Sequence, residues 1–465
     1  MKRNNLLAVF TLALVVGMVP SCTKVDEQIY SQNTPGNFFN SQSDVDAALV
    51  GMYKPWAQCC GGPGQSGTFI LNGASDEGNG LLQWGQFDDL TYTPTGPSEI
   101  GDHWATLYTS IARANFVLSN EAKIRAAIPN TAAAALGEAK FMRALNYFQL
   151  VQMWGGVPLR TRQVERVDDA NIPRSSEADV YKQIIQDLTE AEQSLPATAP
   201  AGKPTKWTAS SYLAKVFLTS KDYPNALAKA NAVIGANVYQ LVPAYADVFT
   251  VANKNNPEVI FAIQHTRVDG LGMRMQPLVL GPDDKFGFGG SGGWGISFAE
   301  NGFYQKYNRA DDRINTAFAN PAPGMKTYYT GKWKDVQGVS ADGHGNNFIL
   351  LRYADLLLIQ AEAANEVNGP TAAAYAPINQ VRARAKLPVL VTGLTKDQFR
   401  DAVLNERMWE LSWEEVRWFD LKRTGRLAAT LRAIGKNWND RYLLFPIPQS
   451  EIDASNGVLK QNPGY

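Results

Sequence analysis

Cysteine and histidine are scarce in this chain, which has three of each among its 465 residues. The cysteines are Cys22, Cys59 and Cys60. Adjacent cysteines rarely bridge each other, and so few thiols and imidazoles make a poor metal site. We therefore expect no disulfide framework and no metal centre. Phosphate-binding loops, serine-nucleophile elbows and zinc motifs are also absent from the sequence.

Excess charge is lacking as well, because 44 basic residues are matched by 44 acidic ones. This balance argues against a nucleic-acid partner. No segment after the first 22 residues has the roughly 20 consecutive apolar residues that a membrane-spanning helix needs. Aromatic residues, in contrast, are abundant, with 11 Trp, 18 Tyr and 20 Phe. Such rings fill a core or, where they are exposed, stack on a ligand.

The N-terminus is typical of an export signal. Two basic residues precede an apolar run from Leu6 to Val19 that is too short to span a bilayer. A cysteine then follows a small residue, which resembles the bacterial lipobox, although the proline before them is not typical of it. We expect residues 1–21 to be removed, leaving 42 basic and 44 acidic residues, Cys22 to be acylated and 22–36 to form a tether. A plain secretory signal is the alternative.

The spacing of apolar residues predicts short helices in pairs. Between Thr208 and Gly235, apolar residues recur every three or four positions on both sides of a break. Pro224 fits the first turn of the second helix, and Gly235 suits the position after its end. A pair this short needs neighbours to cover its apolar face. We predict a mostly α fold in which four tetratricopeptide-like helix pairs form a scaffold.

Caps and helix breakers predict further helix boundaries. The expected helices are one from Ser43 that ends by Pro55, one over 100–128, one from Thr131 to Trp154 stopped by Gly155, one capped by Ser175 or Ser176, one over 350–369, and a partner that begins at Pro377.

Two stretches break the helical pattern and are predicted to form an irregular, loop-rich face. Residues 57–100 are rich in turn residues, and 238–345 contain short β-like runs, such as 258–263, and the glycine-rich sequence FGFGGSGGWG. A long irregular insertion in a regular scaffold is usually functional. The glycines formally match a dinucleotide fingerprint, but no strand precedes them, so a ligand-facing loop is the better interpretation.

Charged residues recur every three or four positions near the C-terminus, which allows them to pair along or between helices. They are Glu406, Arg407, Glu410, Glu414, Arg417, Asp420 and Arg423. We interpret them as buried or half-buried ion pairs of the scaffold. Three acidic pairs on loops are weak candidates for a glycosidase, because adjacent side chains tend to point in different directions. These pairs are Asp76–Glu77, Asp88–Asp89 and Asp311–Asp312.

Several motifs together carry a resemblance to a known family. They are NERMWELSWEEVRWFDLKRTG (405–425), LLFPIP (443–448), QNPGY (461–465), GEAKFMRALNYFQLVQMWGGVPL (137–159), LLRYADLLLIQAEAANE (350–366) and NQVRARA (379–385). In combination they resemble the SusD/RagB family of Bacteroidetes surface lipoproteins, which capture nutrients, mostly glycans. The resemblance covers essentially the whole mature chain. Glu415, where the family commonly has glycine, and Pro377 depart from its pattern.

The resemblance implies one compact unit with an N-terminal half (37–237) and a C-terminal half (238–465). It also implies a non-catalytic lipoprotein, anchored in the outer membrane and facing the cell exterior. Such a protein captures oligosaccharide or polysaccharide and delivers it to a SusC-like TonB-dependent transporter. We expect no cofactor, and the sequence leaves open whether a structural calcium ion is bound.

The ligand site is expected on the irregular face, because the family binds glycan there. Sugar rings need flat apolar surfaces and nearby amides or carboxylates for their hydroxyl groups. Two loops supply such side chains, and the candidate residues are Asp76, Asn79 and Trp84 in the first and Phe286, Phe288 and Trp294 in the second. We expect Trp84 and Trp294 to stack on sugar, and Asn79 and Asp76 to bind hydroxyls.

Other functions stay open at this point. The chain could be a helical-repeat assembly adaptor without a small ligand, although an adaptor has no use for an exposed aromatic loop. It could also be an uptake lipoprotein that binds peptides. A surface glycosidase is the third alternative, and we expect no such activity.

Overall fold

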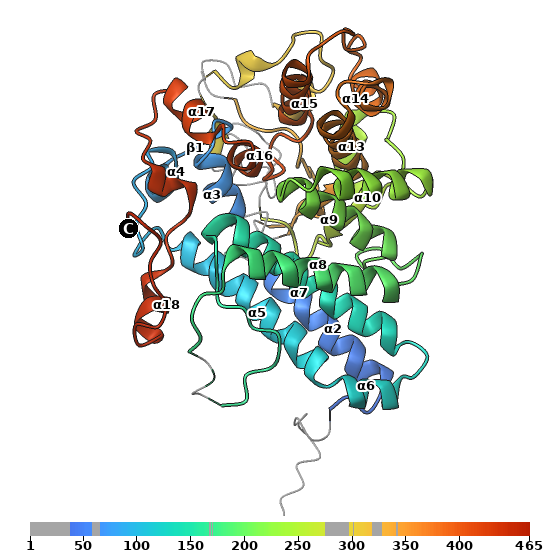
Figure 1. The fold of residues 1–465 in the computed structure, drawn as a ribbon, viewed down its shortest axis with the longest axis vertical. Helices are drawn as coiled ribbons and strands as arrows, with labels where there is room; N and C mark the ends of the chain where they lie inside the picture. The colour runs from blue at the N-terminus through green and yellow to red at the C-terminus, as the bar shows by residue number, and fades with distance from the viewer. Residues whose placement is uncertain are drawn as a thin grey trace, which may run out of the picture.

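The computed structural model describes residues 38–57, 66–166, 169, 171–274, 297–300, 302–318, 328–340 and 343–465. These residues form mainly helices, together with two short antiparallel sheets of two strands each (Figure 1). No helix in this part of the chain is long and apolar enough to cross a membrane. The predicted signal, the tether and all three cysteines lie outside the described residues.

The N-terminal half is organised around one buried helix, α7 (Ala132–Trp154). Apolar residues occur on all its sides, so neighbouring helices must cover it. The covering helices are α2 (Gln42–Ala57), α5 (Glu99–Ser119), α6 (Glu121–Ala127) and α8 (Glu177–Ser194), which lie side by side in Figure 1. α7 ends at Gly155, which has a φ of 74° that glycine adopts without strain, as predicted.

The stack of helices continues into the C-terminal half. It contains α9 (Lys206–Thr219), α10 (Tyr223–Gly235), α13 (Tyr353–Asn368), α14 (Ala372–Arg384) and α15 (Lys396–Glu410). α8 contacts α9, α9 contacts α10, α10 contacts α13, and α13 contacts both α14 and α15. The mostly helical fold class is therefore confirmed. Because α10 packs on α13, the irregular insertion between them leaves the scaffold and returns to it.

Several predicted boundaries are confirmed. Ser176 caps α8, since its hydroxyl accepts a hydrogen bond from the backbone N–H of Asp179 at 3.1 Å. Pro224 lies in the first turn of α10, as expected. Gly235, however, is the last residue of that helix, and the left-handed position falls two residues later, at Asn237 (φ 52°).

The predicted helix boundaries at Ser43, Pro55 and Pro377 were wrong. Ser43 does not begin the first helix, because the hydroxyl of Ser41 accepts the N–H of Asp44. α2 then passes through Pro55 to Ala57. A proline leaves the carbonyl four residues earlier without its helical donor, and Arg113 of α5 donates to that carbonyl, on Gly51, at 2.6 Å. Pro377 likewise lies inside α14, which begins at Ala372.

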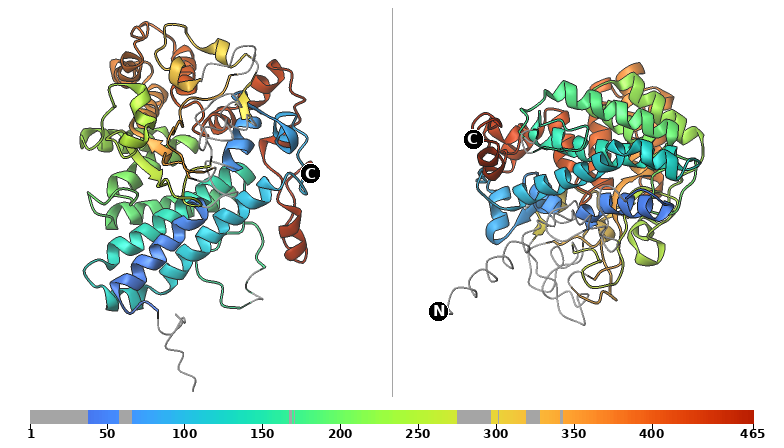
Figure 2. Two further views of the ribbon diagram at one scale, coloured as in Figure 1. Left: turned by 180° about the vertical axis from the view of Figure 1, so that it is seen from behind. Right: turned by 90° about the horizontal axis from the view of Figure 1, so that it is seen from below.

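The two sheets connect distant parts of the chain. β2 (Val259–Ile263) pairs with β4 (Phe348–Arg352), which confirms the β-like run at 258–263 but shows that the predicted helix over 350–369 begins with strand. β1 (Gly78–Gly80) pairs with β3 (Ser297–Ala299). Figure 2 (left) shows this second pair beside the C-terminal helices, away from the layer of α2, α5 and α7.

Buried ion pairs join the insertion to the last helices. Arg352, the final residue of β4, contacts Glu258 Oε1 at 2.7 Å, Glu410 Oε1 at 2.5 Å and Glu414 Oε2 at 2.8 Å. Arg313 in turn contacts Asp311 and Glu406 at 2.7 Å and Glu410 at 2.8 Å. All of these side chains are buried. The interpretation of the C-terminal charges as buried ion pairs is confirmed.

This cluster predicts a large loss of stability when its central cation is removed. Arg352→Met removes the cation that Glu258, Glu410 and Glu414 share and leaves these buried carboxylates with fewer positive charges. We therefore expect the free energy of unfolding to fall by about 3–5 kcal/mol. Urea denaturation measures the change without screening the charges.

The matched control is Lys386→Met, because the Lys386–Asp312 pair is 70% and 39% exposed. Breaking this exposed pair is expected to cost about 0–1 kcal/mol. Similar losses in the two variants would contradict the central role of Arg352.

Candidate ligand-binding face

The β1–β3 pair links the two loops that the sequence singles out. Asn79 is opposite Phe298 and Gly80 is opposite Ser297 in the register. Ser297 comes directly after the stretch that contains the glycine-rich sequence. Phe286, Phe288 and Trp294 themselves lie outside the described residues, so their role as ligand contacts stays a prediction.

Trp84 is held at the surface by two contacts. It ends the short helix η1 (Leu82–Trp84) and is half-buried. Its ring stacks on Phe69 of α3 (Ser66–Gly73), with 4.6 Å between centroids and 16° between planes. The indole Nε1 donates a hydrogen bond to Glu99 Oε1 at 2.6 Å. The indole is therefore fixed in position before any ligand arrives.

Two exposed leucines precede Trp84. Leu81 and Leu82 are 48% and 78% exposed. The turn that places them is tight, because a Cβ added at Gly80 would lie 2.9 Å from the backbone oxygen of Trp84. These leucines were not predicted from the sequence as candidate contacts. A signal was present, since two adjacent apolar residues stand between a glycine and a tryptophan in an irregular stretch.

Asn79 is half-buried on β1 and keeps one polar group for another partner. Its Oδ1 accepts the backbone N–H of Gly80 at 2.7 Å. Among the described residues nothing accepts from its amide nitrogen. The amide is therefore suited to donate a hydrogen bond to a hydroxyl, as the sequence predicts, and this role stays a prediction.

Asp76 requires a correction. It is fully buried, and its carboxylate accepts hydrogen bonds from Arg417 Nε and Nη2 at 2.8 and 2.9 Å and from Lys306 Nζ at 2.7 Å. Burial alone would raise the pKa of Asp76, but the bonds and charges of the two cations hold it well below its usual value. Asp76 is thus a structural anion, not a hydroxyl-binding residue on the surface.

Glu77, directly before β1, is buried in a different state. Its Oε1 accepts the backbone N–H of Trp413 at 2.9 Å. Burial is the largest effect on this carboxyl group and raises its pKa to about 8. Glu77 is therefore mostly protonated at neutral pH, next to an Asp76 that is charged.

Three of the four acids in the other two pairs form ion pairs, and the fourth, Asp89, is exposed. Asp311 contacts Arg313, Asp312 contacts Lys386, and Asp88 contacts Lys436 at 2.6 Å. In the part of the chain that the structure describes, no group of three or more His, Cys, Asp or Glu residues could hold a metal ion.

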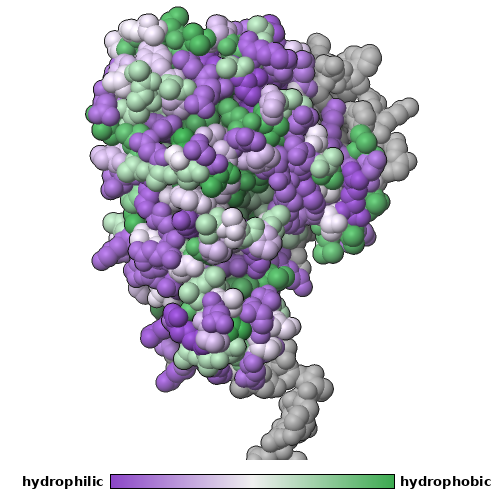
Figure 3. Space-filling model, turned by 90° about the vertical axis from the view of Figure 1, so that its right-hand side faces the viewer, coloured by the Kyte–Doolittle hydropathy of each residue, from purple (hydrophilic) through white to green (hydrophobic). Residues whose placement is uncertain are grey.

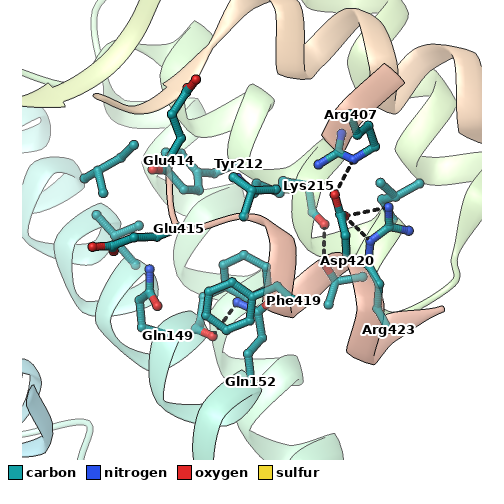
Figure 4. Close-up of a pocket in the computed structure, with 16 residues that line it drawn as sticks. Gln149, Gln152, Tyr212, Lys215, Arg407, Glu414, Glu415, Phe419, Asp420 and Arg423 are labelled. Atoms are coloured by element: carbon teal, nitrogen blue, oxygen red, sulfur yellow. Dashed lines mark hydrogen bonds and ion pairs between the residues drawn. The ribbon is translucent and has the colours of Figure 1, made fainter. Parts of the chain in front are cut away.

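A second set of ion pairs lines one side of a small cavity (Figure 4). Asp420 lies between Arg407 and Arg423, at 2.7 and 2.8 Å, and Arg407 also contacts Asp355 at 2.7 Å. The cavity, of about 50 Å³, reaches from these residues to Glu414 and Glu415. A water molecule needs about 10–15 Å³ by the same kind of measure, so the cavity has room for a few waters and not for a sugar.

The surface on the right-hand side of the molecule in Figure 1 is mixed in polarity. Figure 3 shows the side at the right of Figure 1, where hydrophilic and hydrophobic residues alternate and apolar atoms line a hollow near the middle. Such a mixture is usual for a protein surface. A larger cleft, of about 560 Å³, lies on the opposite side, between α15, α16 (Arg417–Arg423) and α17 (Leu427–Ala433).

Family models cover nearly all of the chain. The model described as "SusD family" matches residues 224–465, and the model described as "Starch-binding associating with outer membrane" matches residues 23–218. The chain therefore belongs to the SusD family.

Similar proteins agree with this assignment. SusD-like proteins P38 and P2 of Formosa agariphila are 29% and 27% identical over the full length of both chains. Among solved structures, a SusD superfamily protein from Parabacteroides distasonis has a TM-score of 0.81, with 24% identity over 91% of this chain and 99% of its own. A "Laminarin binding SusD-like protein" has a TM-score of 0.79, with 27% identity over 92% and 100%.

The raised pKa of Glu77 predicts how stability changes with pH. The pKa is about 8 in the folded protein against 4.5 for an ordinary glutamate, so the folded state holds an extra proton between these values. The contribution of Glu77 to stability is therefore present at low pH and is lost as the pH rises toward 8. Glu77→Gln keeps a neutral side chain, so its stability relative to the natural protein should increase from pH 5 to 8 and then level off.

Urea denaturation at several pH values measures this difference. Glu121→Gln on the exposed surface of α6 is the control, and its difference should stay constant over the same range. Parallel pH curves for Glu77→Gln and the natural protein would show that Glu77 is ionised in the fold.

Proposed function

We propose that this protein is a non-catalytic, lipid-anchored lipoprotein of the outer membrane that binds glycan at the cell exterior. It delivers oligosaccharide to a SusC-like TonB-dependent transporter. Membership of the SusD family supports the uptake role, and the name of the second family model supports association with the outer membrane. The match to a laminarin-binding SusD-like protein makes laminarin-type glucans the first ligands to test.

The observation that carries the proposal is the fixed position of Trp84. A sugar ring stacks on an aromatic face at little entropic cost when the ring is already held, and Phe69 and Glu99 hold this one. The amide of Asn79 lies nearby on β1, and Leu81 and Leu82 extend the apolar surface. In this role Trp84 contacts the apolar face of the sugar and Asn79 donates to a hydroxyl.

Binding without catalysis is supported by the state of the acids. A glycosidase needs two carboxyl groups facing a common substrate across a cleft. Asp76, Asp311 and Asp88 instead pair with cations of the scaffold, and Glu77 is buried against the backbone of Trp413. The chain acts by affinity, and the transporter takes the captured ligand.

Replacing Trp84 tests the binding role. Because the stacking surface is lost, Trp84→Ala should weaken the binding of laminari-oligosaccharides at least about tenfold, which corresponds to about 1.4 kcal/mol. Calorimetry on the mature protein measures the affinity. The control is Trp207→Ala, which removes another half-buried tryptophan, on α9 of the scaffold. Equal affinities for the two variants would contradict the site.

Replacing Cys22 tests the anchor. Acyl chains hold a protein on a membrane only if the acceptor thiol is present, so Cys22→Ala should abolish labelling by a fatty-acid analogue and move the protein from the membrane fraction to the supernatant. Cys59→Ala is the control and should remain labelled and membrane-bound. Unchanged fractionation of Cys22→Ala would rule out this cysteine as the anchor.

A further inference from the structure

The cleft of about 560 Å³ is separate from the surface around Trp84, although Asp76 belongs to its wall. It lies between α15, α16, α17 and the short helix η6 (Tyr304–Lys306). Its size falls within the range of about 300–1,000 Å³ that is usual for small-molecule sites. In Figure 1, α16 and α17 stand next to β1, at the upper left of the molecule.

One end of the cleft is cationic. Lys306 and Arg417 both line it, and their side chains are 33% and 13% exposed. Asp76 is their shared partner, which leaves two positive charges against one negative charge. Asp76 uses Nε and Nη2 of Arg417 and one hydrogen bond of Lys306. An ammonium has three donors and a guanidinium five, so both cations retain donors for a second anion.

The other charged residues of the wall are already paired. Asp420 contacts Arg407 and Arg423, and Arg426 contacts Asp401. These pairs are neutral or positive as groups, so they do not repel an anion from the end that Lys306 and Arg417 form.

The rest of the wall suits a sugar ring better than a bare anion. Trp409 is half-buried, and its Nε1 donates to the backbone oxygen of Lys306 at 3.0 Å, which fixes the indole beside the cationic end. Asn405 is exposed and Thr430 half-buried, and neither side chain has a hydrogen bond to another described residue. Apolar side chains complete the wall, namely Leu404, Met408, Leu421, Ala433 and Ile434.

We propose that this cleft is a second binding site, which takes a carboxylate-bearing sugar such as a uronic acid. The carboxylate binds the unused donors of Lys306 and Arg417, the ring lies on Trp409, and Asn405 and Thr430 meet the hydroxyl groups. This inference rests on the proposed function in one respect, namely that the ligands are saccharides.

The first experiment compares three probes with the mature protein, namely D-glucuronate, D-glucose and acetate. Calorimetry at low ionic strength measures the affinities. Acetate can form only the charge-assisted bonds and glucose only the ring contacts, whereas glucuronate can form both. Glucuronate should therefore bind at least about tenfold more tightly than either of the others. Acetate as tight as glucuronate would overturn the sugar site, and glucose as tight as glucuronate would overturn the role of the cations.

Variants then locate the binding. Lys306→Gln leaves Asp76 paired with Arg417, so the fold is retained, and it should weaken glucuronate binding about tenfold because a charge-assisted bond is lost. Asn405→Ala, at an exposed position, should weaken it by a smaller factor. Lys386→Gln is the matched control for an exposed lysine and should not change the affinity. Unchanged binding in both Lys306→Gln and Asn405→Ala would overturn the proposal.

Trp84→Ala separates this inference from the proposed function. Glucuronate binding that persists in this variant, while laminari-oligosaccharide binding falls, supports two sites. Loss of glucuronate binding in Trp84→Ala would overturn the second site. If the natural protein bound glucuronate and no neutral glycan, the proposed function would be contradicted, and the binding site in the cleft would still be supported.

Discussion

The buried contact between Arg352 and Glu410 is the constraint on which the rest of the structure depends. It joins β4 to the end of α15, and Glu258 and Glu414 complete the surroundings of the guanidinium. Burying these charges is costly, and the arrangement is tolerated only because each charge has close partners. Because the charges are buried, a shift of one partner would leave another without a close contact. The cluster therefore fixes β4, where the chain returns from its long insertion, against the last helices of the scaffold.

The same cluster determines where the candidate ligand-binding face lies. The chain after Glu410 turns sharply through Trp413, which has a φ of 64°, and the backbone N–H of Trp413 binds Glu77. Arg417 contacts Asp76, the residue directly before Glu77. Two adjacent acids thus attach the start of β1 to the C-terminal helices. The position of Trp84 relative to the scaffold follows from these bonds and from the pairing of β1 with β3.

The sequence predicted the parts of the fold that depend on local patterns. Apolar periodicity and caps were sufficient for α7, α8, α9 and α10, because these helices satisfy their own backbone and need only a covered face. The errors at Pro55 and at the start of the predicted helix over 350–369 came from interactions with distant residues. Pro55 is tolerated because Arg113 supplies a donor, and Leu350 to Arg352 pair with β2 although their apolar run suits a helix.

The candidate site was predictable to a similar extent. Composition and loop signals were enough to predict that Trp84 stays partly exposed, since a tryptophan among turn residues has few neighbours in sequence that could bury it. Its contact with a ligand stays a prediction. They were not enough to judge Asp76, whose partners Lys306 and Arg417 lie far along the chain. A lone acid on a loop has the same local pattern whether it faces water or two cations. Only the fold decides between these states.

Glu415 shows how such a distant partner also sets the local backbone. It has a φ of 58°, a left-handed conformation that costs a residue with a side chain about 1–2 kcal/mol. Its carboxylate accepts the hydroxyl of Thr68 at 2.9 Å and lies against Gly67, where a Cβ would be 2.6 Å from Glu415 Oε2. The chain thus places its glycine on α3, opposite the strained residue. Gly67 makes room for the carboxylate, and the bond to Thr68 ties α3 to the same turn that holds β1.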